Sequence, residues 1–281
     1  MAMAECCVSC LYQKQKHLTG DESYLSEIRQ ILDARRECDT PPYMVYLFQQ
    51  AYERHFGKGS PYGEIKRRYN DLVLSMEEAV REQIEEAEDP LVRALLFARV
   101  GNYIDFGAMD EVDEAAFLSL LGNSAASEQD ARTVDAFLRQ CETAECFLLI
   151  SDNCGEIVLD KLFLEQLKKR FPALKMTVLV RGGEALNDAT REDAAYVGLD
   201  KVAEIADNGS SIAGTVYGTL PAQTKEILDR ADVILAKGQG NYESLSRQGR
   251  HIFYSFLCKC ELFTGRFQVP LFSGVFTEET E

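Results

Sequence analysis

The segment CFLLISDNCGE, residues 146–156, decides the fold class of this chain. It begins as a β-rich apolar run, Cys146–Ile150, turns through polar residues and opens a helical pattern, Glu156–Phe171. Similar runs lie at Met176–Val180, Val233–Ala236 and Ile252–Leu257, and helical patterns at Glu128–Cys141, Arg191–Val197 and Pro221–Arg230. This alternation predicts a mostly parallel sheet with helical crossovers, the doubly wound α/β class.

The first 125 residues have a different pattern. Apolar residues recur there at spacings of three and four, which predicts helices at Glu22–Arg36, Met44–Phe56, Tyr62–Glu86 and Leu91–Tyr103. Asp89-Pro90 is a start signal for the last of these, because aspartate caps helices and proline fits their first position. We therefore predict a helical domain over residues 1–125 and an α/β domain over residues 126–281.

Charge and composition exclude several classes of protein. With 46 acidic and 30 basic residues the net charge is −16, and such a field repels nucleic acids and anionic membranes. The N-terminus shows no signal segment, and no apolar run reaches the roughly 18 residues of a membrane span. We expect a cytoplasmic protein with neither nucleic-acid nor membrane partners; the sequence does not predict an oligomeric state.

Polar side chains gather directly after the predicted strands, where open α/β sheets bind their ligands. Asp152 and Asn153 follow the first strand, and Asp188 closes the loop after the second. They offer oxygen ligands only, a set that suits a hard divalent cation such as magnesium or manganese. Each aspartate taken singly is better explained as a helix cap, but together they predict a metal site.

Two further loops offer groups that bind phosphate. Lys237 would supply a mobile cation, and Gly238 and the glycine after Gln239 would let backbone N–H groups approach a phosphate closely. The loop Asp207–Ser211 adds hydroxyl and backbone donors. Metal and lysine together could neutralise a phosphoryl group.

The helix at Leu91–Tyr103 gives a second indication. Asn102 and Asp105 continue the apolar face of this helix, so an amide and a carboxylate point inward and need partners. They either form an interdomain hydrogen bond or reach over the strand ends to the metal or substrate.

These residues together resemble the damage-control phosphatase family, long catalogued as domain-of-unknown-function family 89, and in particular its stand-alone prokaryotic branch. The resemblance spans nearly the whole chain. It rests on an ordered set of motifs: Cys7 and Cys10; Pro61-Tyr62 with Lys66 and Asn70; Gly101-Asn102 with Ile104-Asp105-Phe106-Gly107; Asp152-Asn153-x-Gly155-Glu156; Asn187-Asp188-Ala189-Thr190; Asn208-Gly209-Ser210-Ser211; and Lys237-Gly238-Gln239-Gly240-Asn241.

The resemblance implies a helical region packed on a Rossmann-like three-layer α/β/α domain that hydrolyses phosphate monoesters of sugar phosphates or damaged metabolites. It places a divalent metal (manganese, magnesium, cobalt or nickel) on Asp152, Asn153 and Asp188, and phosphate on Lys237. Residues expected to contact the substrate are Glu156, Asn102, Asp105, Ser210, Gly238 and Asn241. Whether water or a carboxylate attacks the phosphorus is left open.

The cysteines allow a second site. Cys7 and Cys10 lie near one end of the chain and Cys258 and Cys260 near the other, and alternate residues of an extended segment share a face. Cys7, Cys10 and Cys260, with or without Cys258, could hold structural zinc or iron, or could be plain thiols.

Two rival functions are an S-adenosylmethionine-dependent carboxyl methyltransferase and a phosphometabolite-binding protein without catalysis. Neither accounts for the oxygen ligands after the strands. A Rossmann cofactor binder would also want a Gly-x-Gly-x-x-Gly turn after the first strand, where the chain has Asp152–Gly155.

Overall fold

A six-stranded sheet forms the centre of the protein in a computed structural model that describes residues 3–57, 62–103, 119, 121 and 128–280. The strands are β1 (Cys146–Ile150), β2 (Lys175–Val180), β3 (Glu204–Asp207), β4 (Val233–Lys237), β5 (Ile252–Leu257) and β6 (Gly274–Glu279). Their order is β3-β2-β1-β4-β5-β6, with every pair parallel except β5 and β6. The sheet is therefore mostly parallel, as the sequence predicts.

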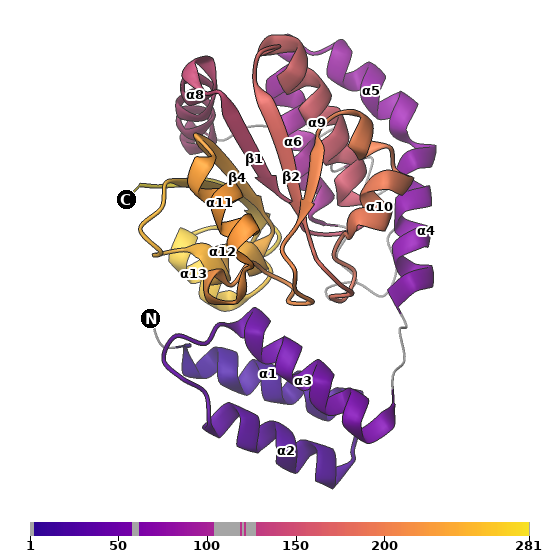
Figure 1. The fold of residues 1–281 in the computed structure, drawn as a ribbon, viewed down its shortest axis with the longest axis vertical. Coiled ribbons are helices and arrows are strands. Elements are labelled where there is room, and N and C mark those ends of the chain that lie inside the picture. The colour runs from indigo at the N-terminus through magenta and orange to yellow at the C-terminus, as the bar shows by residue number, and fades with distance from the viewer. Residues whose placement is uncertain (1–2, 58–61, 104–118, 120, 122–127, 281) are drawn as a thin grey trace.

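Helices cover both faces of this sheet (Figure 1). On one face lie α6 (Pro90–Gly101), α8 (Glu128–Thr143) and α9 (Glu156–Arg170), whose side chains share a core with Leu149 and Val178. On the other face α11 (Ala222–Arg230), α12 (Gln239–Leu245) and α13 (Glu261–Phe267) pack against Leu148 and Ile150. The alternation of strand residues between two cores produces three layers, and the predicted α/β/α fold class is confirmed.

The N-terminal helices belong to two different cores. Helices α1 (Glu5–Leu18), α2 (Glu22–Asp33) and α3 (Pro41–Phe56) form a cluster of their own around Tyr24 and Phe48. Helices α4 (Tyr62–Ser75) and α5 (Glu77–Glu85), with α6, instead share the core of α9 and the sheet. The domain boundary predicted at residues 125 and 126 falls within 122–127, outside the described residues.

Figure 1 shows α1–α3 together at one end of the molecule, on the side of the loops that follow the strands. The start of α3 makes this contact. A Cβ atom on Gly214 or on Gly240 would lie 3.0 or 3.6 Å from the side chain of Pro42. The N-terminal helices therefore lie against the loops that carry the predicted site.

Several helix boundaries differ from the predicted ones. Helix α3 begins at Pro41, three residues before the predicted start, because proline is well tolerated in a first helical turn. The helix predicted over Tyr62–Glu86 is divided at Met76, where the Ser75 hydroxyl donates to the Leu72 carbonyl oxygen and competes with the backbone. Asp89 caps α6 as predicted, since its carboxylate accepts from the amides of Leu91 and Val92.

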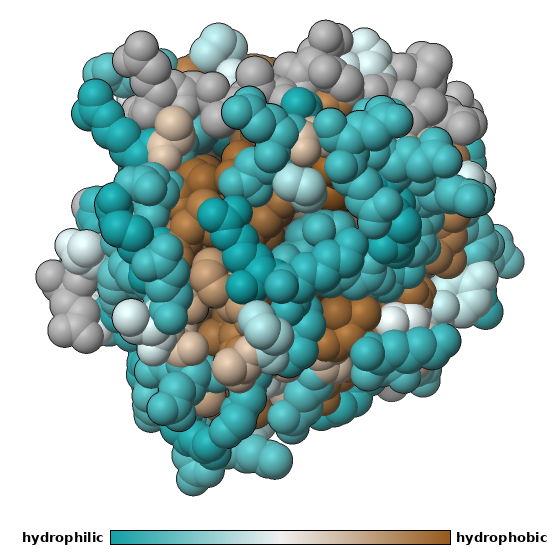
Figure 2. All heavy atoms as spheres, turned by 90° about the horizontal axis from the view of Figure 1, so that it is seen from above, coloured by the Kyte–Doolittle hydropathy of each residue, from teal (hydrophilic) through white to brown (hydrophobic). Residues whose placement is uncertain are grey.

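The face of the molecule seen from above is mainly polar (Figure 2). Figure 2 shows one face covered largely by hydrophilic side chains, with hydrophobic ones visible in the gaps between them. Among the residues that the structure describes, no helix is both long and apolar enough to cross a lipid bilayer.

Candidate active site at the switch point of the sheet

The candidate site lies where the strand order reverses. From β1 the chain adds β2 and β3 on one side and then returns to add β4 on the other, and such a reversal is where open α/β sheets bind their ligands. Asp152, after β1, and Gly238, after β4, come into close contact there. A Cβ atom on Gly238 would lie 2.0 Å from Asp152 Oδ2, and the residue has φ +79°, so only glycine leaves room for this carboxylate.

Backbone hydrogen bonds join the loops after β1 and β2. Asn153 and Asp188 form an isolated antiparallel bridge. On either side of it, the Ala189 amide donates to the Asp152 carbonyl oxygen over 2.8 Å, and the Cys154 amide donates to the Asn187 carbonyl oxygen over 2.8 Å. The structure thus brings together Asp152, Asn153 and Asp188, the residues predicted to bind metal.

Asp152 is buried among polar groups. Its Oδ2 accepts hydrogen bonds from Asn102 Nδ2 at 2.8 Å and Asn153 Nδ2 at 2.7 Å, and the residue is 8% exposed. Burial raises the pKa of this carboxyl well above its usual range, and the negative charges of Asp188 and Glu156 raise it further. Asp152 therefore lies in a place where negative charge has accumulated.

Asn102 joins three elements at this point. Its amide nitrogen donates both to Asp152 and to Glu156 Oε2, the latter over 3.0 Å, and its Oδ1 accepts from the Leu257 amide at the end of β5. The predicted inward direction of Asn102 is what the structure shows. Asp105, predicted to accompany it, lies outside the described residues.

Lys237 lies deeper than the sequence suggests. Its side chain is fully buried, and its ammonium group donates to Glu156 Oε1 (2.7 Å), Asp160 Oδ1 (2.6 Å) and the Ala98 carbonyl oxygen (2.9 Å). The expected mobile cation is thus a fixed one, because β4 ends inside the core and its last side chain points toward α9. The three ammonium hydrogens of Lys237 are thus directed to these three acceptors. Contact of Lys237 with phosphate stays a prediction.

The Lys237 ion pairs oppose the effect of burial on the ionisation of Lys237 and Asp160. Burial alone would lower the pKa of Lys237, but the charges of Asp160 and Glu156 outweigh it and raise that pKa. Burial raises the pKa of Asp160 to about 7, against the opposing effect of Lys237. The ammonium group is therefore kept charged, and it holds Glu156 at the start of α9.

Arg181 was not singled out from the sequence, although it directly follows the second predicted strand. Its guanidinium Nε donates to Asp188 Oδ2 over 2.6 Å, and its Nη2 lies 3.6 Å from Asp152 Oδ1. The side chain is 1% exposed. Attention to the first residue after each strand, rather than to the acidic end of the loop, would have found it.

Asn241 and Ser210 hold the surrounding loops. Asn241 Nδ2 donates to the carbonyl oxygens of Ser151 and Lys237, and its Oδ1 accepts from Arg181 and Thr215. The amide and hydroxyl of Ser210 both donate to Asn208 Oδ1. Contact of either residue with a substrate stays a prediction.

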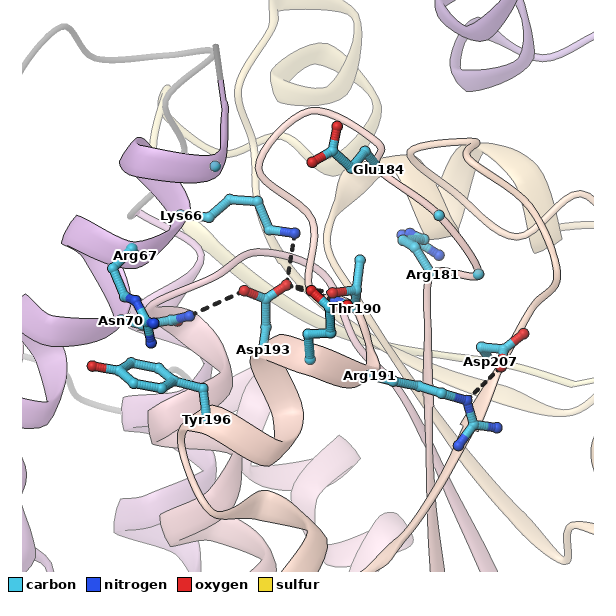
Figure 3. Close-up of a pocket in the computed structure, with 14 residues that line it drawn as sticks. Lys66, Arg67, Asn70, Arg181, Glu184, Thr190, Arg191, Asp193, Tyr196 and Asp207 are labelled. Atoms are coloured by element: carbon cyan, nitrogen blue, oxygen red, sulfur yellow. Dashed lines mark hydrogen bonds and ion pairs between the residues drawn. The ribbon is translucent and has the colours of Figure 1, made fainter. Parts of the chain in front are cut away.

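A cavity of about 720 Å³ opens beside this network, between α4, the end of β2 and α10 (Arg191–Tyr196) (Figure 3). Lys66 crosses toward Asp193, with its ammonium nitrogen 2.6 Å from the carboxylate, and the Arg67 guanidinium lies 3.6 Å from the centre of the Tyr196 ring. Charged side chains of both signs line the cavity, which therefore suits a polar molecule.

Asn70 links this wall to the predicted metal ligands. Its Oδ1 accepts from the Gly155 amide over 2.7 Å, and its Nδ2 lies 3.4 Å from Asp193 Oδ1. Lys66 and Asn70 carried part of the family resemblance without an assigned role. The structure places both where α4 meets the loop after β1 and the start of α10.

The cysteines come together only in part. Burial, together with the nearby Cys6, Glu243 and Cys260, raises the pKa of Cys7 to about 12, whereas Cys10 is exposed. Within the described part of the chain, no three His, Cys, Asp or Glu side chains are arranged to hold a metal ion. The cysteine site stays a prediction. The predicted oxygen site is not such a group of three, because one of its ligands is the amide oxygen of Asn153.

Comparisons with known proteins agree with this architecture. The model of the damage-control phosphatase ARMT1-like domain matches residues 2–275. A damage-control phosphatase of Archaeoglobus fulgidus is 31% identical over 274 residues, 93% of each chain. A damage-control phosphatase of Pyrococcus horikoshii is 27% identical over 80% of this chain and 76% of its own length.

A solved structure shows the same fold. The crystal structure of a DUF89 family protein from Pyrococcus horikoshii superposes with a TM-score of 0.83 over 99% of both chains, at 23% sequence identity. Together with the match over nearly the whole sequence, this establishes that the chain belongs to the damage-control phosphatase ARMT1-like family.

Proposed function

We propose that this protein is a metal-dependent phosphatase that hydrolyses phosphate monoesters of small metabolites, with a divalent cation held by Asp152, Asn153 and Asp188. The observation that carries the proposal is the convergence of these side chains at the switch point of the sheet. The names of the relatives from Archaeoglobus fulgidus and Pyrococcus horikoshii support phosphatase chemistry on this fold.

The residues present fit a divalent cation. Asp152 and Asp188 are both buried, and Asp188 and Glu156 add to the effect of burial in raising the pKa of Asp152. Carboxylates crowded in a poorly solvated place repel one another, and a bound cation removes that repulsion. When bound, a divalent cation would polarise the phosphoryl group and lower the pKa of water.

The protein's own groups fix the carboxylates. Asn102 and Asn153 both donate to Asp152 Oδ2, and the Arg181 Nε donates to Asp188 Oδ2, so each carboxylate has one oxygen held by a hydrogen bond. Lys237 fixes Glu156 in the same way, because its ammonium group donates to Glu156 Oε1. Such prior orientation removes most of the rearrangement that catalysis would otherwise require.

The cavity beside the carboxylates suits the leaving group. Its volume of about 720 Å³ admits a small metabolite, and its charged lining favours a hydroxylated or charged one. We therefore propose sugar phosphates or damaged phosphorylated metabolites as substrates.

The experiment that tests the function is release of inorganic phosphate from a panel of sugar phosphates, nucleotides and cofactor fragments. Magnesium, manganese, cobalt and nickel are added separately to protein first treated with a chelator. We expect release that depends on the metal. Absence of release with every metal and ester, from folded protein, would contradict the proposal.

The predicted ligands can be removed one at a time. We expect Asp152→Ala and Asp188→Ala to lose the metal-dependent activity by at least about 10²-fold, because each removes a ligand while backbone hydrogen bonds still join the two loops. Circular dichroism and the stoichiometry of bound Mn²⁺ accompany the rates. The exposed Asp200→Asn serves as control, and full activity in either alanine variant would exclude this metal site.

A further inference from the structure

Arg181 is held at the centre of the candidate site by its backbone. Its amide donates to the Ala189 carbonyl oxygen over 2.9 Å, and it forms a parallel bridge with Thr190. The next residue is equally fixed, because a Cβ atom on Gly182 would lie 2.5 Å from the Cα atom of Gly209. The side chain therefore starts from a rigid point at the end of β2.

Two loops and a helix then orient the guanidinium group. Nε donates to Asp188 in the loop after β2, and Nη1 donates to Thr215 in the loop after β3 and to Asn241 in α12, both over 3.2 Å. Asn241 is itself tied to the carbonyl oxygens of Ser151 and Lys237. Three contacts in different directions leave a planar group such as guanidinium little freedom to rotate.

The remaining nitrogen, Nη2, forms no hydrogen bond to the residues that the structure describes. It is buried and lies 3.6 Å from Asp152 Oδ1, within the range of an ion pair. Buried donors are nearly always paired, and one that is not calls for an explanation, such as a ligand that it binds. Arg181 also lines the 720 Å³ cavity (Figure 3), so the same residue borders both the cavity and Asp152.

Two other buried cations near the site are already engaged. The ammonium hydrogens of Lys237 are directed to Glu156, Asp160 and Ala98, and the ammonium group of Lys66 pairs with Asp193. Both ion pairs would cost free energy to break. Arg181, in contrast, is a buried cation beside Asp152 and Asp188 with a donor that makes no hydrogen bond among the described residues.

We infer that Arg181 is a catalytic residue whose Nη2 donates hydrogen bonds to the non-bridging oxygens of the phosphoryl group; this inference rests on the proposed phosphatase function. Arginine is suited to the task, because its parallel N–H groups match two phosphoryl oxygens. Charge on these oxygens is stabilised most in the transition state, where the phosphoryl group passes between two oxygen atoms.

The reaction balances without a proton from Arg181. The oxygen of water ends bonded to phosphorus while the ester P–O bond breaks. The bonding pair leaves with the alkoxide oxygen, which takes one proton of the water. Arg181 stays protonated throughout, because a guanidinium group is not deprotonated in proteins.

The test compares Arg181→Gln and Arg181→Lys with the matched control Arg139→Gln. Arg139 lies on α8, outside the cavity lining, and its exposed guanidinium pairs with Asp135. Calorimetry measures binding of inorganic phosphate with Mn²⁺ present, and of Mn²⁺ alone, and steady-state kinetics gives kcat and KM. Thermal unfolding shows whether each variant is folded, and lysine keeps the buried charge if glutamine does not permit folding.

We expect both Arg181 variants to bind Mn²⁺, to bind phosphate at least about tenfold more weakly and to lose about 10²–10³-fold in kcat, with lysine the milder change. The control should match the wild type. Unchanged phosphate affinity in a folded variant would overturn the inference, as would loss of Mn²⁺ binding in Arg181→Lys, since the arginine would then act only through Asp188. A wild type that binds phosphate without hydrolysing any ester would contradict the proposed function instead, and the comparison of phosphate affinities would still decide the role of Arg181.

Discussion

The close contact between Gly238 and Asp152 depends on the absence of a Cβ atom at position 238. At position 238 a side chain would occupy the space of the Asp152 carboxylate and would also have to adopt φ +79°. We expect Gly238→Ala to lower the free energy of unfolding by about 1–3 kcal/mol and to abolish activity, because it moves Asp152. Urea unfolding and phosphate release measure the two effects.

The matched control is Gly218→Ala. A Cβ atom there meets nothing within 4 Å, so this change should leave stability within about 0.5 kcal/mol and activity at the wild-type level. Equal effects of the two substitutions would mean that Gly238 is not needed for close approach.

Lys237 gives a second prediction at the level of single residues. Lys237→Met leaves Glu156 and Asp160 buried without their cation, so we expect unfolding to become easier by about 3–5 kcal/mol in urea titrations. The exposed Lys201→Met should change little. Loss of activity at unchanged stability would instead favour the direct contact with phosphate that the sequence suggested.

The sequence predicts the acidic and amide residues of the site, but it does not predict which basic side chains are already paired. Asp152, Asn153 and Asp188 are recognisable because oxygen ligands directly follow strands, and the structure brings them together. Lys237 was expected to be mobile and Arg181 was overlooked. Which basic side chain is already paired depends on Glu156 and Asp160 one helical turn apart, a contact across elements that no local pattern reveals.

Among the elements, α4 supports the site through Asn70, which accepts a hydrogen bond from the Gly155 amide. We expect Asn70→Ala to lower the free energy of unfolding by about 1–3 kcal/mol and to weaken Mn²⁺ binding, because it leaves the buried Gly155 amide without its acceptor beside Asn153. Urea unfolding and Mn²⁺ calorimetry measure the effects. Arg68→Ala, exposed on the same helix, is the control, and intact stability with Asn70→Ala would show that α4 does not support this loop.

Apolar strands that are buried on both faces were predictable, whereas the edge strand β6 and the short helices α12 and α13 were not. The strands β1, β2, β4 and β5 stand out because they are apolar runs buried on both faces. Strand β6 ends Thr-Glu-Glu and is only partly buried at the sheet edge, so it lacks that signal. Helices α12 and α13, of seven residues each, are too short for a repeating apolar face.

On the scale of the whole molecule, α12 also meets the N-terminal helices. Glu243 on α12 is partly buried near Lys14 and Cys7 of α1. Burial raises its pKa from the usual 4.5 to about 7, while Gln239 and Lys14 act in the opposite direction. The folded protein therefore favours the protonated carboxyl group.

Stability should depend on pH accordingly. The contribution of protonated Glu243 is complete below pH 4.5 and is lost as the pH rises to about 7, because the folded state then holds a buried negative charge. We expect Glu243→Gln to raise the melting temperature relative to the wild type at pH 8 but not at pH 4.5. The exposed Glu226→Gln should show no such difference, and equal shifts at both pH values would contradict the assignment.

The bridge between Asn153 and Asp188 has a consequence for protein engineering. Backbone hydrogen bonds join their two loops, so exchanging side chains at positions 152, 153 and 188 leaves these bonds in place. The ligand set can thus be redesigned separately from the scaffold. Imidazole or thiolate ligands at these positions would replace hard oxygen donors with softer ones, and the same fold would become a host for zinc or copper chemistry.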